Sequence, residues 1–298
     1  MIELHSRASN VRGTRMGKQG HHPLDGQTGL QRLFELQRRY NGLYASYLRR
    51  QVNRTLDPND KENAAWLDEE WKVIHYFGVG ADALRVIVAA LTDNLRDVPG
   101  SILDFPCGSG RVTRHLRAFF PDSRLVACDL YDYHVRFCVD ELGAEGVISK
   151  ENFDEIEFEP GFDLIFCGSL LTHLPEDLFR SALRLISRSL TDRGIAIVTL
   201  HGRHSEFIQK HRWKYIDDSL YAAVESTLGE TGFGYADYDN DFRSKFNRQA
   251  RYGLTLCRPH WTLGAAEEDY GIRVLGYTER GWDDHHDVLV IGRPSINE

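Results

Sequence analysis

The stretch Ser101–Leu116, with the sequence SILDFPCGSGRVTRHL, contains the change of pattern on which the fold depends. An apolar run ends at Asp104, a loop of small residues follows, and a helical pattern begins near Gly110. A strand, a loop and a helix in this order are typical of the first unit of a βαβ arrangement. Small residues in the loop allow a ligand to approach the backbone closely. The stretch therefore predicts a ligand site at the carboxyl end of a strand.

Short apolar runs separated by helical patterns continue after this stretch. The runs lie at 101–105, 124–129, 145–149, 163–167 and 194–199, and the helical patterns lie at 110–119, 131–142 and 176–190. Strands that alternate with helices predict a parallel sheet with helices on both faces. Two further strand patterns, 272–279 and 287–294, are joined by a connection too short for a helical crossover, so we expect an antiparallel hairpin.

The predicted fold class is therefore α/β. We expect a Rossmann-like sheet of seven strands, mostly parallel, with a C-terminal antiparallel hairpin and an N-terminal helical cap. The cap is predicted from Leu and Tyr residues at helical spacing after residue 28, and an amphipathic helix is predicted at 81–95.

Composition limits the classes of partner. The net charge of −8 argues against a broad nucleic-acid-binding surface, which needs clustered Lys and Arg. No run approaches the ~20 apolar residues of a membrane span, and the first residues lack the apolar core of a signal peptide. We therefore expect no membrane span and a cytoplasmic location. The five cysteines form no C-x-x-C pair, so neither a disulfide framework nor a zinc ribbon is expected.

The segment Asp104–Gly110, DFPCGSG, resembles motif I of the class I S-adenosylmethionine-dependent methyltransferases, in which an acid is followed by alternating glycines. Two glycines match, and Pro106 stands where the family has its first glycine. The resemblance covers 100–200 well and 272–294 more loosely, and the last strand is loosely similar to that of methyltransferases found beside glycosyltransferases. It implies that S-adenosylmethionine is the cofactor and that the motif binds it through Asp104, Phe105, Pro106, Cys107, Gly108 and Gly110.

A dinucleotide is the alternative ligand. Its fingerprint, G-x-G-x-x-G, is met by Gly108 and Gly110 but lacks a third glycine here. A carboxylate at Asp104 would repel a pyrophosphate, whereas it would attract the ammonium group of a methionine moiety. The charge favours S-adenosylmethionine over NAD, so an NAD-dependent oxidoreductase is the second hypothesis. A methyltransferase-like protein that binds the cofactor without catalysis is the third.

The resemblance also implies cofactor contacts after the next strands. Asp129 ends the second strand, where an acid accepts hydrogen bonds from both ribose hydroxyls, and Leu130 follows it. Ser149 stands where the family often has an acid that contacts the adenine. FDLIFCGSLLTHLP, residues 162–175, resembles motif IV, and its residues Cys167, Gly168 and Ser169 would pass the sulfonium by their backbone.

Two histidines are candidates for the catalytic base. His173 and His201 each follow a predicted strand, so both are expected at the same edge of the sheet. Histidine can accept a proton near neutral pH. The run Asp283–Asp287, DDHHD, also offers metal-ligating side chains. Adjacent residues of an extended segment point to opposite faces, so we predict a polar turn and no metal there.

The segment 202–265 follows the alternating part of the chain and is rich in aromatic residues. Two interpretations remain for them: stacking on a sugar or planar acceptor, or a small satellite core that covers the sheet edge. The residues are Trp213, Tyr215, Tyr235, Tyr238, Tyr252 and Trp261. The predicted function is methyl transfer to a small-molecule or saccharide acceptor, with O-methylation as the first expectation. No oligomeric state follows from the sequence.

These patterns divide the chain into five predicted regions. They are a flexible tail at 1–27, a helical cap with the first core helix at 28–98, the cofactor-binding methyltransferase core at 99–201, an insertion or lid at 202–265, and the C-terminal strands that complete the core at 266–298.

Overall fold

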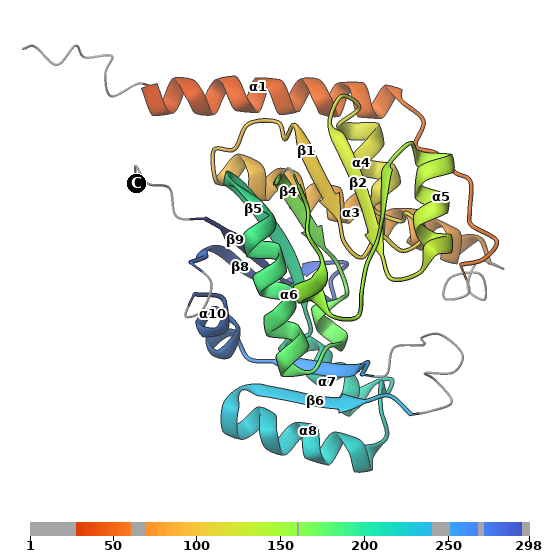
Figure 1. The fold of residues 1–298 in the computed structure, drawn as a ribbon, viewed down its shortest axis with the longest axis vertical. Helices are drawn as coiled ribbons and strands as arrows, with labels where there is room; N and C mark the ends of the chain where they lie inside the picture. Colours follow the sequence, from red (N-terminus) through yellow and green to blue (C-terminus); the bar gives the residue numbers. More distant parts are fainter. Residues whose placement is uncertain (1–27, 61–68, 160, 240–250, 268–270, 294–298) are drawn as a thin grey trace, which may run out of the picture.

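A computed structural model describes most of the chain, namely residues 28–60, 69–159, 161–239, 251–267 and 271–293 (Figure 1). The tail predicted at 1–27 lies outside the described residues.

A seven-stranded sheet forms the centre of the molecule (Figure 1). In spatial order, its strands are β3 (Glu145–Ile148), β2 (Arg124–Asp129), β1 (Ser101–Asp104), β4 (Phe162–Cys167), β5 (Leu190–Leu200), β9 (His286–Gly292) and β8 (Arg273–Trp282). The strands from β3 to β5 pair in parallel, whereas β9 is antiparallel to both β5 and β8. The predicted fold class, with its closing antiparallel hairpin, is confirmed.

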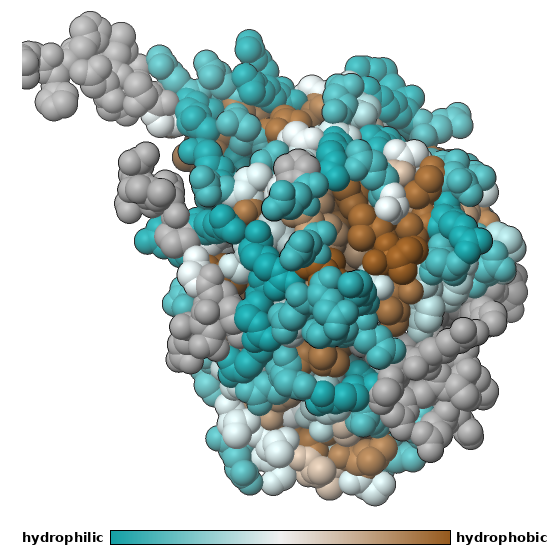
Figure 2. All heavy atoms as spheres, viewed as in Figure 1, coloured by the Kyte–Doolittle hydropathy of each residue, from teal (hydrophilic) through white to brown (hydrophobic). Residues whose placement is uncertain are grey.

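Helices cover both faces of the sheet because successive strand residues point to opposite sides. Ile102 packs into a core with the N-terminal helices, and its neighbour Leu103 packs into a core with a helix on the other face. The first face carries α1 (Thr28–Arg49), α3 (Glu70–Asp93), α4 (Thr113–Phe119) and α5 (Asp132–Leu142); the second carries α6 (Glu176–Ser189) and α10 (Pro259–Glu267). Figure 2 shows hydrophilic side chains over most of the face that includes α6, as expected for a helix whose apolar stripe faces the sheet.

Helix α3 is longer than the helix predicted at 81–95, because the apolar pattern extends back to Glu70. Among the described residues it is the one helix long and apolar enough to cross a membrane by length and composition. A core helix meets the same criterion, and ten residues of α3 are buried in this fold, among them Ala83, Ile87 and Leu91. Burial against the sheet therefore accounts for its apolar character.

The segment after β5 forms a small layer of its own at the carboxyl edge of the sheet (Figure 1). It contains α7 (Arg203–His211), α8 (Asp218–Thr231) and a two-stranded antiparallel sheet of β6 (Phe233–Asp237) and β7 (Gly253–Cys257). Its satellite core includes Ile216, Val224, Leu228, Leu254 and Leu256. The segment therefore forms a satellite core, on which Tyr215, Tyr238 and Tyr252 pack, and Tyr252 also lines the cavity described below.

Two contacts join this layer to the ends of the central strands. The amide of Cys257 donates to the carbonyl of His201 at 3.0 Å. The Thr255 hydroxyl donates to the carbonyl of Leu174 at 2.6 Å. Strand β7 thus lies against both segments that carry the candidate bases.

The tip of the β8–β9 hairpin is held against α3. Trp282 Nε1 donates to the carbonyl of Val79 at 3.0 Å, and the amide of Asp283 donates to Asp82 Oδ2 at 2.7 Å. Asp283 and Asp284 form the turn with φ values of 54° and 49°, in the left-handed region that short polar residues tolerate best after glycine. These contacts fix the position of the residues that begin β9.

Candidate active site

A cavity of about 250 Å³ lies at the carboxyl ends of β1, β2 and β4. This is the edge of the sheet at which open α/β folds bind ligands. Most residues that the sequence placed at the cofactor lie on its wall: Asp104, Phe105, Pro106, Cys107, Gly108, Asp129, Leu130, Ser149, Gly168 and Ser169. The candidate base His173 lines the same cavity.

Three residues of the predicted site lie off the cavity wall. Gly110 has a φ of 75°, and a Cβ there would stand 2.3 Å from Leu142, so this glycine allows the loop to pack on α5. Cys167 is fully buried in the core beneath α6. His201 is buried at the end of β5, behind His173.

Asp104 is the buried acid of the cavity. Its carboxylate accepts a hydrogen bond from Thr113 Oγ1 at 2.6 Å, and the residue is 1% exposed. Burial, with a smaller contribution from the charge of Asp129, raises the pKa of Asp104 to about 7. Among the described residues no cationic side chain forms an ion pair with it. A buried carboxyl group that faces a cavity without a cation fits a ligand with an ammonium group.

Asp129 organises the loop that follows β1. Its Oδ2 accepts from the amide of Gly108 at 2.9 Å, and its Oδ1 accepts from the amide of Tyr131 at 3.0 Å. Each carboxylate oxygen retains further lone-pair capacity. The arrangement is compatible with two ribose hydroxyls at this carboxylate while it holds Gly108 in its left-handed conformation, with φ at 48°.

Pro106 stands at the first glycine position of the motif. The peptide bond before it is cis, and Pro106 is not among the residues with positive φ. The amide donors of the neighbouring residues are used within the sheet, from Phe105 to the carbonyl of Phe166 and from Cys107 to the carbonyl of Cys128, each at 2.9 Å. A proline, which lacks an amide donor, is therefore compatible with this position.

The turn after β4 brings its backbone onto the cavity wall. Ser169 has a φ of 57°, a left-handed conformation that is uncommon for a residue with a side chain. Its amide donates to Thr199 Oγ1 of β5 at 2.8 Å, which holds the conformation. Gly168 and Ser169 consequently line the same cavity as Asp104 and His173.

The sequence interpretation missed the segment 53–57, which follows α1 and contacts the loop beside the cavity. Asp57 Oδ2 accepts from Ser109 Oγ at 2.7 Å, and Ser109 Oγ lies 2.7 Å from His134 Nδ1. Arg114 Nη1 donates to the carbonyls of Asn53 and Thr55 at 2.9 and 2.8 Å. The segment has the composition of a turn, and nothing in its own pattern indicates a contact with residues fifty positions later.

His173 is held in one tautomer. Its Nδ1 lies 3.0 Å from the carbonyl oxygen of Gly253 and 3.1 Å from the hydroxyl of Tyr238. A carbonyl only accepts, so Nδ1 carries the proton in the neutral ring and Nε2 carries the lone pair. The ring stacks on Tyr252 with centroids 4.5 Å apart. Burial lowers the pKa of His173 to about 4, so the ring is neutral at physiological pH.

The core of the chain also matches a known family. Residues 102–194 match the family model described as a methyltransferase domain. These residues form a methyltransferase domain, and the protein is an enzyme with S-adenosylmethionine as its cofactor. The family match therefore favours the first of the two ligands considered from the sequence.

Solved structures similar to this chain have low sequence identity to it. One is an S-adenosylmethionine-dependent methyltransferase from Clostridium acetobutylicum, 12% identical, with a TM-score of 0.48 and coverage of 72% of this chain and 91% of that chain. Another is the 1,6-didemethyltoxoflavin-N1-methyltransferase of Burkholderia thailandensis, which is 15% identical, with a TM-score of 0.46 and coverage of 77% of this chain and 80% of that chain. A TehB-like methyltransferase from Corynebacterium glutamicum is 20% identical, with a TM-score of 0.46 and coverage of 80% of this chain and 100% of that chain. A search of curated proteins finds no match.

The state of Asp104 predicts how cofactor binding depends on pH. The pKa of Asp104 is raised to about 7, so below this pH the protein without ligand carries the neutral acid. Binding an ammonium group favours the ionised form, so a proton must leave on binding. We expect the Kd of S-adenosylhomocysteine to rise about fivefold from pH 7 to pH 6, and to approach a tenfold rise per pH unit below that, measured by calorimetry. His173 stays neutral in this range because its pKa is about 4. A pH-independent Kd would contradict the assignment.

Proposed function

We propose that the enzyme methylates an oxygen atom of a small-molecule or saccharide acceptor that binds beside His173. The observation that carries the proposal is the fixed tautomer of His173. Its Nδ1 donates to the carbonyl of Gly253, so its Nε2 has a free lone pair, and the residue lies on the wall of the cofactor cavity. A hydroxyl group needs a base as it attacks, and a neutral imidazole nitrogen supplies one. We also propose that the enzyme acts in the cytoplasm.

The residues of the cavity have two roles, namely binding the cofactor and accepting the proton of the acceptor. When bound, S-adenosylmethionine supplies a methyl group on a sulfonium centre. Asp104 binds the ammonium group, and Asp129 accepts from the ribose hydroxyls. The backbone of Gly168 and Ser169 forms the wall on the way to the acceptor side. His173 Nε2 accepts the proton of the acceptor hydroxyl and holds that oxygen in place.

Aromatic residues on the acceptor side support a ring-shaped acceptor. Tyr252, from the insertion, and Trp282, from the end of β8, both line the cavity. Flat aromatic faces bind the apolar face of a sugar ring or a planar molecule. Tyr252 is further fixed by its stacking on His173.

Thermal unfolding tests the choice of cofactor. We expect S-adenosylhomocysteine at about one hundred times its Kd to stabilise the protein by about 2.7 kcal/mol, and so to raise Tm by about 5 °C. NADH at the same concentration should leave Tm unchanged. A rise with NADH alone would overturn the cofactor assignment.

Product analysis tests the acceptor atom. The enzyme is incubated with methyl-labelled S-adenosylmethionine and panels of sugars, nucleotide sugars and phenols, and the products are fragmented by mass spectrometry. We expect the label on an oxygen. Label on nitrogen or carbon would overturn the proposed O-methylation and leave the methyltransferase assignment intact.

A further inference from the structure

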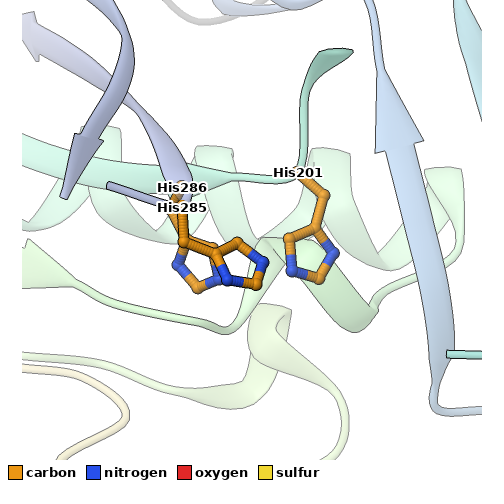
Figure 3. Close-up of side chains that lie close together, drawn as sticks. All are labelled: His201, His285 and His286. Carbon is orange, nitrogen blue, oxygen red and sulfur yellow. The ribbon is translucent and has the colours of Figure 1, made fainter. Parts of the chain in front are cut away.

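Three histidines from two segments far apart in the sequence meet behind the acceptor side of the cavity. His201 follows β5, whereas His286 is the first residue of β9 and His285 precedes it in the turn. One ring nitrogen of each lies within 4.8 Å of a ring nitrogen of each of the others. Figure 3 shows His285 and His286 on one segment, with the ring of His201, from another segment, facing theirs. We call these residues the histidine cluster.

Two nitrogens of the histidine cluster lack a partner. Nδ1 of His201 and Nδ1 of His286 are buried and have no hydrogen-bond partner among the described residues. A buried nitrogen without a partner is destabilising unless something binds it. Neutral imidazole is the form of histidine that coordinates metals.

His285 has the support typical of a metal ligand. Its Nε2 lies 2.6 Å from the hydroxyl of Tyr215, which leaves Nδ1 as the second ring nitrogen. Histidine ligands usually donate their other ring N–H to an oxygen, and this contact fixes the ring orientation and tautomer. Tyr215 comes from the insertion, between α7 and α8.

The backbone is shaped to bring the two segments together. A Cβ at Gly202 would lie 1.8 Å from Asp287 Oδ2, so only glycine allows the end of β5 to approach β9 this closely. Asp287 is held in turn by the hydroxyl of Tyr277 at 2.6 Å and the amide of Arg280 at 2.9 Å. The residues on either side, His201 and His286, have ring centroids 4.8 Å apart.

We propose that His201, His285 and His286 form a binding site for a divalent transition metal of the zinc class. Three imidazoles suit Zn²⁺, Co²⁺ and Ni²⁺, and a three-ligand zinc site leaves one position for water or a substrate oxygen. Tetrahedral coordination with Zn–N bonds of about 2.0–2.1 Å brings the nitrogens to roughly 3.3 Å from one another, so the rings move closer on binding.

The site lies next to the proposed acceptor position. The ring of His201 is 5.8 Å from that of His173, and the ring of His286 is 5.2 Å from that of Trp282; both neighbours line the cavity. A metal there would favour acceptors with oxygen atoms that coordinate metals. The metal site itself rests on the histidine geometry and does not depend on the proposed methyl transfer.

The sequence interpretation rejected a metal at Asp283–Asp287 because adjacent residues of an extended segment diverge. His285 belongs to the turn between Trp282 and β9, where this rule does not hold, and its amide donates to the carbonyl of Trp282 at 3.1 Å. The third ligand comes from His201, which the sequence had considered only as a base. The fold thus supplies the distant partner that the local pattern lacked.

Metal content tests the proposal. The protein is produced without a polyhistidine tag, loaded with Zn²⁺, passed over a chelating resin and analysed by plasma mass spectrometry. We expect about one tightly bound zinc per chain, and Co²⁺ in its place should give the visible absorption of a tetrahedral site. Less than about a tenth of an equivalent of zinc would overturn the proposal.

Variants assign the metal to the histidine cluster. His285→Gln, at a half-buried position, should weaken Zn²⁺ binding at least 100-fold, and Tyr215→Phe should weaken it about tenfold, measured by competition with a chromophoric chelator. The matched control is His260→Gln, an exposed histidine of α10, with unchanged affinity expected. Circular dichroism without metal confirms that each variant is folded. Zinc retained at full affinity by His285→Gln would locate the metal elsewhere, for instance at His21 and His22, and overturn the proposal.

Discussion

Asp104→Asn is expected to weaken the binding of S-adenosylhomocysteine by at least about 100-fold, because the ammonium group then lies at a buried site without a counter-charge. The same change should stabilise the enzyme without ligand at pH 8. The folded protein raises the pKa of Asp104 from 3.8 to about 7, so the ionised form destabilises the fold at pH values above 7. This cost decreases as the pH falls through 7 towards 4, and its full value is about 4 kcal/mol. Asparagine removes it and still accepts the hydrogen bond of Thr113.

Calorimetry and thermal unfolding measure these two effects of opposite sign. The matched control is Asp122→Asn, at an exposed position of the loop before β2, for which neither the Kd nor Tm should change. A variant at Asp104 that loses both binding and stability would indicate a structural role for this acid. A variant that binds normally would show that the ammonium group lies elsewhere.

His173→Asn is expected to lower kcat by about 10²- to 10⁴-fold on a hydroxyl acceptor, the range associated with the loss of a general base. Asparagine places an N–H where His173 Nδ1 stands, so it can still donate to the carbonyl of Gly253, and it lacks the nitrogen at the Nε2 position. The Kd of S-adenosylhomocysteine should change less than about twofold, because the proposed cofactor contacts, Asp104 and Asp129, are unchanged in this variant.

Turnover is measured with an acceptor from the product screen, at saturating cofactor. His211→Asn, an exposed histidine of α7, is the matched control and should retain full activity. An unchanged kcat in His173→Asn would exclude this histidine as the base. A parallel loss of cofactor affinity would instead assign His173 to positioning of the cavity.

The sheet could be predicted from the sequence because its signals are local. The apolar run 124–129 coincides with β2, and the run 194–199 lies within β5, which begins earlier because Leu190 pairs with Phe162 across an irregularity in the ladder. The antiparallel pairing of β8 and β9 could be predicted because the connection between them is too short for a helical crossover. Helix α4 begins at Thr113 and not at Gly110, because a turn stands between the loop and the helix.

The site was less accessible to sequence analysis because it depends on contacts between distant segments. Gly110 matches a cofactor motif, yet its missing side chain is needed for packing on Leu142. The contact of Asp57 with Ser109 joins segments with no shared pattern. His201 and His286 become neighbours only because β9 inserts beside β5 in antiparallel orientation. A motif indicates residue types at a spacing, whereas these relations require the register of the folded strands.

The insertion of β9 between β5 and β8 also has a consequence for biosynthesis. The strands β1 to β5 emerge from the ribosome first, and β5 keeps an open edge until about ninety later residues have been translated. An unpaired edge in the centre of a sheet is a site for aggregation or for chaperone binding. Slow translation or substitutions within β9 should therefore reduce the yield of soluble enzyme more than equivalent changes in the peripheral strand β3.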